Sequence, residues 1–199
     1  MPAPDQVSII NAALGHISMG PIVSLTESPK AKSAARAWDP ALRASLREGA
    51  PRFARAVVAL ALHASYTNPH WLYAYKYPAN CLKMLLVYNE GETDTARGQN
   101  FCEFYTPDTN ERIIATNCDL AYGEYVYTVE DPTLFDPSFV VALQLRLAAD
   151  LAVPLVGDRD LADKLGDDFK VAASECHRHN EGEQNSPAKQ TSVFVTARG

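Results

Sequence analysis

The sequence predicts an α+β protein that is mainly α: a helical bundle built from N- and C-terminal helices, with an inserted small antiparallel β-sheet and an extended C-terminal tail. Apolar residues recur at three- and four-residue spacing near both ends of the chain, whereas aromatic and β-branched residues gather between Trp71 and Glu130. We therefore divide the chain into N-terminal helices of the bundle (1–65), a β-rich insertion (66–134), C-terminal helices of the bundle (135–180) and a tail (181–199).

The N-terminal part has three segments with helical spacing. The first follows Asp5, a suitable N-cap, and ends at Gly20-Pro21. The second begins at Ser28-Pro29, where serine caps the helix and proline occupies its first turn, and we expect Gly49 to supply the left-handed residue that ends it. Pro40 lies inside this helix and predicts a bend near 36–40. The spacing predicts a third helical segment over 51–62.

The middle of the chain predicts β-strands. Short runs of aromatic and β-branched residues occupy 81–88, 101–105, 111–116 and 122–129. Turn-forming residues separate them, so a single small antiparallel sheet is the simplest arrangement.

Helical spacing returns after Asp136-Pro137, another N-cap followed by a first-turn proline, and predicts a helix that ends before Pro154. A last helix is predicted from the stripe Leu161, Leu165, Phe169, Ala172 and Cys176. The tail beyond Asn180 is polar, but it carries the apolar triplet Val193-Phe194-Val195 close to its end. A triplet of this kind, in a segment too short to fold alone, predicts capture by a partner.

Composition disfavours several functions. A net charge of −6 without a basic stripe argues against direct binding of nucleic acid. The apolar run 56–62 is far shorter than the roughly 20 residues that span a bilayer, so no membrane partner is expected. Four cysteines lie scattered without a Cys-x-x-Cys pair, and phosphate-loop, nucleophile-elbow and zinc-protease motifs are absent from the sequence.

Four groups of residues could still carry chemistry, and a structural role is favoured for each. In 175–179, His177 and His179 point about 200° apart on a helix and Cys176 falls on the apolar stripe, which argues against a shared metal. His63 and His70 flank a predicted turn without a carboxylate at motif spacing. The aspartates of 158–168 lack the order of a calcium loop and form a solvated helix face. The aromatic band 66–77 lacks a basic groove for nucleic acid.

Several segments, read in order, resemble the tail tubular protein A family, the adaptor subunits of short-tailed phages. The N-terminal segments are Ala12-Ala13-Leu14-Gly15-His16-Ile17, Pro21-Ile22-Val23-Ser24-Leu25, Ala34-Ala35-Arg36, Trp38-Asp39-Pro40-Ala41-Leu42-Arg43 and Pro51-Arg52-Phe53-Ala54-Arg55. The later ones are Tyr77-Pro78-Ala79-Asn80-Cys81-Leu82-Lys83, Phe135-Asp136-Pro137-Ser138-Phe139-Val140, residues 147–155, Glu181-Gly182 and Thr196-Ala197-Arg198-Gly199. The resemblance covers nearly the whole chain and is weakest over 91–122. One departure is Pro51-Arg52, where the family often has Pro-Trp.

The resemblance implies a structural role in the virion. Members of this family form a twelve-subunit ring, a homo-oligomer at the head-tail interface, which joins the portal protein to the tail nozzle, carries tail fibres in some cases and lets the genome pass through its channel. It implies a protein that is not an enzyme and has no catalytic residue, metal or cofactor. We expect the tail to dock on the portal through Val193, Phe194, Val195 and Arg198.

Two other classes of function stay open at this point. One is a virion-associated hydrolase that acts on peptidoglycan or nucleic acid and uses Glu175, His177 or His63. The other is a soluble binding module that captures a partner through its tail.

Overall fold

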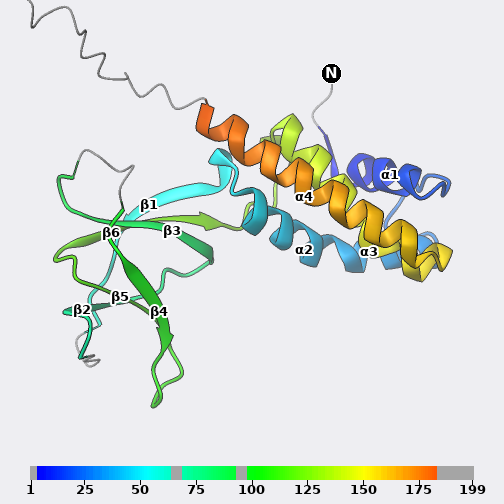
Figure 1. Ribbon diagram of the computed structural model, residues 1–199. Coiled ribbons are helices and arrows are strands. Elements are labelled where there is room, and N and C mark those ends of the chain that lie inside the picture. The colour runs from blue at the N-terminus through cyan, green and yellow to red at the C-terminus, as the bar shows by residue number, and fades with distance from the viewer. Residues whose placement is uncertain (1–3, 64–68, 93–97, 183–199) are drawn as a thin grey trace, which may run out of the picture.

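The computed structural model describes residues 4–63, 69–92 and 98–182, and these form an α+β protein with a helical part and a β part (Figure 1). The helices are α1 (Gln6–His16), α2 (Pro29–Gly49), α3 (Pro137–Val156) and α4 (Arg159–Gly182). The strands are β1 (Arg55–Ala59), β2 (Tyr73–Lys76), β3 (Cys81–Asn89), β4 (Phe101–Tyr105), β5 (Arg112–Thr116) and β6 (Ala121–Tyr127). Short 3-10 turns at Arg52–Ala54 and Pro132–Leu134 connect the two parts.

Side-chain caps set where the helices begin. Asp5 accepts a hydrogen bond from the Ser8 amide, and Ser28 accepts one from the Ala31 amide, so α1 and α2 begin where the sequence predicts. Asp136 does the same for α3, with Pro137 in the first turn.

Three of the predicted helix ends are wrong. Helix α1 ends at His16, four residues before the predicted Gly20-Pro21. The left-handed residue that ends α2 is Ala50, with φ 41°, and not Gly49, which still belongs to the helix. Helix α3 continues through Pro154 to Val156 and ends at Gly157, whose φ is 78°. Glycine adopts this conformation without the penalty that other residues incur, so the glycine and not the proline ends α3.

Helix α3 lies at the centre of the helical part and contacts α1, α2 and α4. Its fully buried side chains include Phe139, Leu143, Leu147 and Leu151. They pack with Leu14 of α1 and with other apolar side chains of α2 in one core. Among the described residues α3 is long and apolar enough to cross a membrane, a test that the core helix of a globular protein also passes.

The β part contains two three-stranded antiparallel sheets instead of the single sheet that was predicted. One has the strand order β1-β6-β3, and the other has β2-β5-β4. The chain after β1 joins them, because the Lys76 amide donates to the Ala61 carbonyl oxygen at 2.8 Å and the His63 amide donates to the Ala74 oxygen at 2.7 Å. A second connection is the hydrogen bond from the Gln99 amide, just before β4, to the Val87 oxygen of β3 at 2.6 Å. The two sheets therefore enclose a second, smaller core.

This smaller core includes Leu60, Tyr75, Met84, Val87 and Ile114, which come from both sheets. Gly123 of β6 leaves room for two side chains of this core, because a Cβ at this position would lie 3.0 Å from Leu60 Cδ2 and 3.1 Å from Met84 Sδ.

The helix predicted over 51–62 is wrong, since this segment forms a 3-10 turn followed by β1. Strand β1 lies inside the 1–65 range, so the sheet begins earlier than the predicted 66–134 insertion. Strands β3, β4, β5 and β6 confirm the four predicted runs to within two residues at each end.

Candidate functional site

The β part is attached to the helical part by a partly buried polar cluster around Arg55. The Arg55 side chain, which is 13% exposed, donates from Nε to the Ala50 carbonyl oxygen at 2.7 Å. Its Nη1 lies 3.5 Å from the Glu124 carboxylate of β6, and its Nη2 lies 3.5 Å from Nδ1 of His177 on α4. One arginine thus connects the end of α2, the first sheet and the last helix.

Two further contacts fix the same junction. Arg47 of α2 donates from Nη1 to the Leu82 carbonyl oxygen of β3 at 2.6 Å. The rings of Phe53, Phe135 and Phe139 pack together with centroid distances of 5.1 to 5.5 Å. Aromatic packing of this kind adds to the burial of apolar area, so the two parts are held by apolar as well as polar contacts.

A second polar cluster lies in the β2-β5-β4 sheet. The Arg112 guanidinium forms an ion pair with Glu103 and lies 3.9 Å from the centroid of the Tyr77 ring. The Tyr77 hydroxyl donates to Glu103 Oε1 at 3.3 Å. Burial raises the pKa of the Tyr77 hydroxyl and that of the Cys81 thiol beside it, which keeps both groups protonated at neutral pH.

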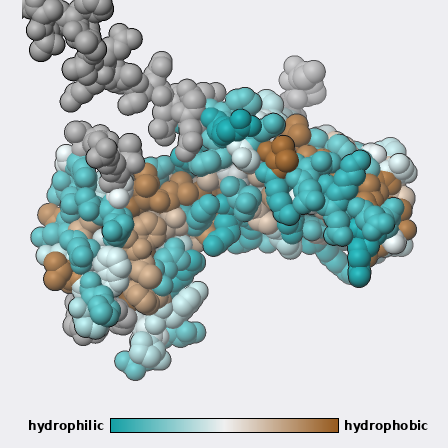
Figure 2. Space-filling view, in the orientation of Figure 1, coloured by the Kyte–Doolittle hydropathy of each residue, from teal (hydrophilic) through white to brown (hydrophobic). Residues whose placement is uncertain are grey.

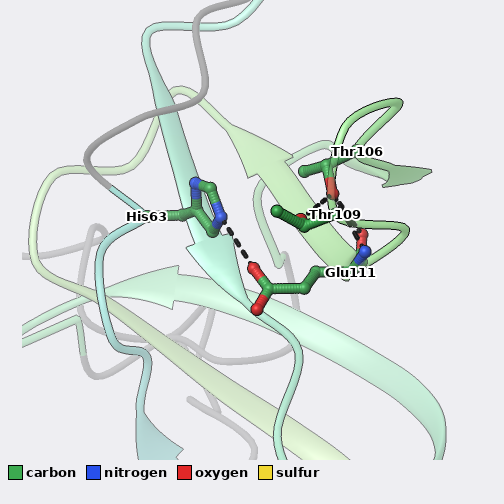
Figure 3. Close-up of polar contacts among 4 residues, drawn as sticks. All are labelled: His63, Thr106, Thr109 and Glu111. Atoms are coloured by element: carbon green, nitrogen blue, oxygen red, sulfur yellow. Dashed lines mark hydrogen bonds and ion pairs between the residues drawn. The ribbon is translucent and has the colours of Figure 1, made fainter.

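His63 and Glu111 come together although 48 residues separate them (Figure 3). His63 Nε2 lies 3.1 Å from Glu111 Oε2, with the histidine side chain 12% exposed and the glutamate 53% exposed. Figure 3 shows the Glu111 side chain directed at the imidazole ring from a turn that also carries Thr106 and Thr109.

The threonine hydroxyls in this turn have structural partners. Thr106 Oγ1 accepts from the Glu111 amide at 2.9 Å, lies 2.6 Å from Thr109 Oγ1 and donates to the Glu111 carbonyl oxygen at 3.3 Å. A hydroxyl that satisfies the turn in this way, with the residue buried, is poorly placed to attack a substrate. Among the residues that Figure 3 draws, the geometry therefore offers an acid-base pair beside a buried threonine that is poorly placed to act as a nucleophile.

The other predicted chemical groups lie apart from this pair. Cys176 is fully buried, as its place on the apolar stripe predicts, and His177 contacts Arg55 whereas His179 is exposed. Asp158 precedes α4 and accepts a hydrogen bond from the Leu161 amide, and the other aspartates of 158–168 lie on the exposed face of the helix, which confirms the solvated face. Within 4–63, 69–92 and 98–182, His, Cys, Asp and Glu form no group of three that could hold a metal.

Of the aromatic band, Tyr75 is buried in the β core and donates from its hydroxyl to the Cys118 carbonyl oxygen at 2.8 Å, which fits the expected packing role. Tyr66 and the predicted portal-docking residues Val193, Phe194, Val195 and Arg198 lie outside the described residues.

Exposed apolar side chains mark two surfaces that could contact other molecules. Val141, Val153 and Val156 of α3 lie within about 120° of its circumference, at 45–50% exposure. In the β part, apolar side chains gather over strand β1 (Figure 2), where Val57 and Val58 are 56% and 38% exposed. The sequence predicted neither surface, because whether an apolar residue is covered depends on tertiary packing.

Comparison of the chain with protein-family models and with curated proteins found no match.

Proposed function

We propose that this chain is a structural subunit of a phage virion, the adaptor that forms a ring between the portal and the tail nozzle and through which DNA passes. The observation that carries the proposal is how the segments that resemble the adaptor family lie in space. Segment 51–55 and segment 135–140 meet in the cluster of Phe53, Phe135 and Phe139, although more than 70 residues separate them. Trp38 and Leu42 share one core with Leu147 and Leu151.

A mechanical role suits this architecture. In the proposed adaptor, α1 to α4 form the helical bundle, and the β part forms an outer or distal surface for contacts. Arg47, Arg55 and the three phenylalanines hold the β part to the helices, so force applied to one part would pass to the other. The exposed valines of α3 would be buried between neighbouring subunits of the ring.

The C-terminal tail is the proposed portal contact. We expect deletion of 185–199 to leave a folded, soluble protein, because the two cores that the structure describes are built from side chains before this segment. The truncated protein should fail to bind portal particles, as measured by co-sedimentation, whereas the full chain binds. Normal incorporation of the truncated protein into virions would contradict the proposal.

A virion-associated hydrolase is the second candidate, and the contact of His63 with Glu111 is the observation that favours it. If it were correct, His63→Ala would abolish hydrolysis of peptidoglycan or nucleic acid by the full chain. The adaptor proposal predicts no such hydrolysis by the full chain or by its His63→Ala variant. The mass of the protein, measured with and without portal, distinguishes the soluble binding module from the adaptor, because only the adaptor assembles into a ring.

A further inference from the structure

Strand β1 has one edge that the described strands leave unpaired. Its register with β6 pairs Arg55 with Val126 and Ala59 with Tyr122, and the same register continues to Leu60, whose amide donates to the Ala121 oxygen at 2.8 Å. In an antiparallel ladder alternate residues face the partner. The backbones of Ala56, Val58 and Leu60 therefore face β6, whereas those of Arg55, Val57 and Ala59 face the other way.

A proline explains why this edge is left open. The chain after β1 uses the same edge to pair with β2, where the Lys76 amide donates to the Ala61 oxygen. The next residue of β1 on this edge is Ala59, and the residue that would lie opposite it is Pro78. Because proline has no backbone N–H, the ladder with β2 ends at Lys76.

A groove of about 340 Å³ lies where the two chain segments separate. Its lining is mostly apolar and includes Val58, Ala59 and Leu60 on one side and Lys76, Tyr77 and Pro78 on the other. Beside it, Val57 is 56% exposed. Proteins usually cover or block an exposed apolar strand edge, because it would otherwise pair with other chains.

The C-terminal tail begins close to this edge. His177 Nδ1 lies 3.5 Å from Arg55 Nη2, so the last turns of α4 lie beside the first residue of β1, and the helix ends at Gly182. Eight residues, 183–190, separate the helix from Thr191. Extended, they reach roughly 26–29 Å, which exceeds the roughly 17 Å length of a five-residue strand.

The composition of 191–196 suits a strand. The segment reads Thr-Ser-Val-Phe-Val-Thr, which contains no charge, glycine or proline, and all but the serine are β-branched or aromatic. We propose that Thr191–Thr196 adds to the free edge of β1 in its own subunit as an extra strand. The added strand pairs with the backbones of Val57 and Ala59 and covers the apolar edge.

This inference does not rest on the adaptor role, because it uses only the edge that the described strands of one subunit leave unpaired. If both hold, the segment leaves β1 when the portal captures it, and assembly becomes an exchange of one strand partner for another.

Amide hydrogen exchange of the full chain, read by NMR, tests the proposal. We expect the amides of Val57 and Ala59 to exchange at least tenfold more slowly than in an unstructured peptide. The double variant Val193→Pro/Phe194→Pro removes a backbone N–H donor from each edge of the added strand. It should accelerate exchange of the Val57 and Ala59 amides at least tenfold. The Leu60 amide, which is bonded to Ala121, serves as the internal reference and should keep its rate. Ala188→Pro, upstream of the segment, is the matched control and should leave all three amides unchanged.

Deletion of 191–199 provides a second variant and should accelerate the same two amides. Unprotected Val57 and Ala59 amides in the full chain would overturn the proposal, and so would protection that survives the double proline variant. Protection that appears only as protein concentration rises would assign the edge to a second copy and would equally overturn it. Because no portal is present, none of these outcomes depends on the adaptor role.

Discussion

Arg55 is the residue that connects most distant parts of the chain. Its guanidinium contacts the Ala50 carbonyl oxygen, Glu124 and His177, which lie 5, 69 and 122 residues away in sequence. Removing one member of a buried ion pair leaves the other charge without compensation, which costs more than the pair contributes.

Arg55→Met should therefore lower the free energy of unfolding by about 2–4 kcal/mol, measured by urea denaturation. Arg43→Met is the control, because Arg43 pairs with Asp39 on the surface of α2 with both side chains about half exposed. This change should cost under about 1 kcal/mol. Equal effects of the two substitutions would show that the Arg55 cluster does not hold the junction.

At the residue scale, the sequence predicted side chains that lie on a periodic stripe and missed those defined by distant partners. Cys176 was placed on the apolar face of its helix, and it is buried. The contacts of Arg55 and the pairing of His63 with Glu111 have no local signal, since each joins residues that meet only through the tertiary fold. Ala50 was missed because glycine is the usual left-handed residue and Gly49 precedes it.

At the scale of elements, helices with caps were predicted best. Asp5, Ser28 and Asp136 each cap a helix as expected, because capping is local chemistry. Strand β1 was missed because Phe53, Val57 and Leu60 also fit helical spacing, and a short apolar run cannot distinguish the two. The two-sheet arrangement depends on pairings of the chain after β1 with β2, which composition does not encode.

Helix α3 should be the element on which stability depends most. Leu147→Ala, at a fully buried position in the core, should lower the free energy of unfolding by about 3 kcal/mol, because it removes apolar contacts and leaves a cavity. Val171→Ala on α4, at 61% exposure, is the control and should change it by under about 0.5 kcal/mol. Chemical denaturation compares them, and a similar loss in both would contradict the central position of α3.

At the scale of the whole molecule, the two ends of the chain build one core and the middle builds another. Helices α1 and α2 pack with α3 and α4, while the β part encloses Leu60, Tyr75 and Met84 in a core of its own. Val126 of β6 and Val129, which follows this strand, are buried in the helical core. The two parts therefore share buried residues at their junction, which suits a subunit that transmits force between partners.

The ring itself is the central claim of the proposed function. Electron microscopy of the full chain mixed with portal particles tests it most directly. The proposed adaptor should add a ring to one end of each portal, with twelve subunits as the family resemblance implies, and the 185–199 deletion should leave the portals bare. Full-length protein that stays monomeric in the presence of portal, with no added ring on any particle, would contradict the account.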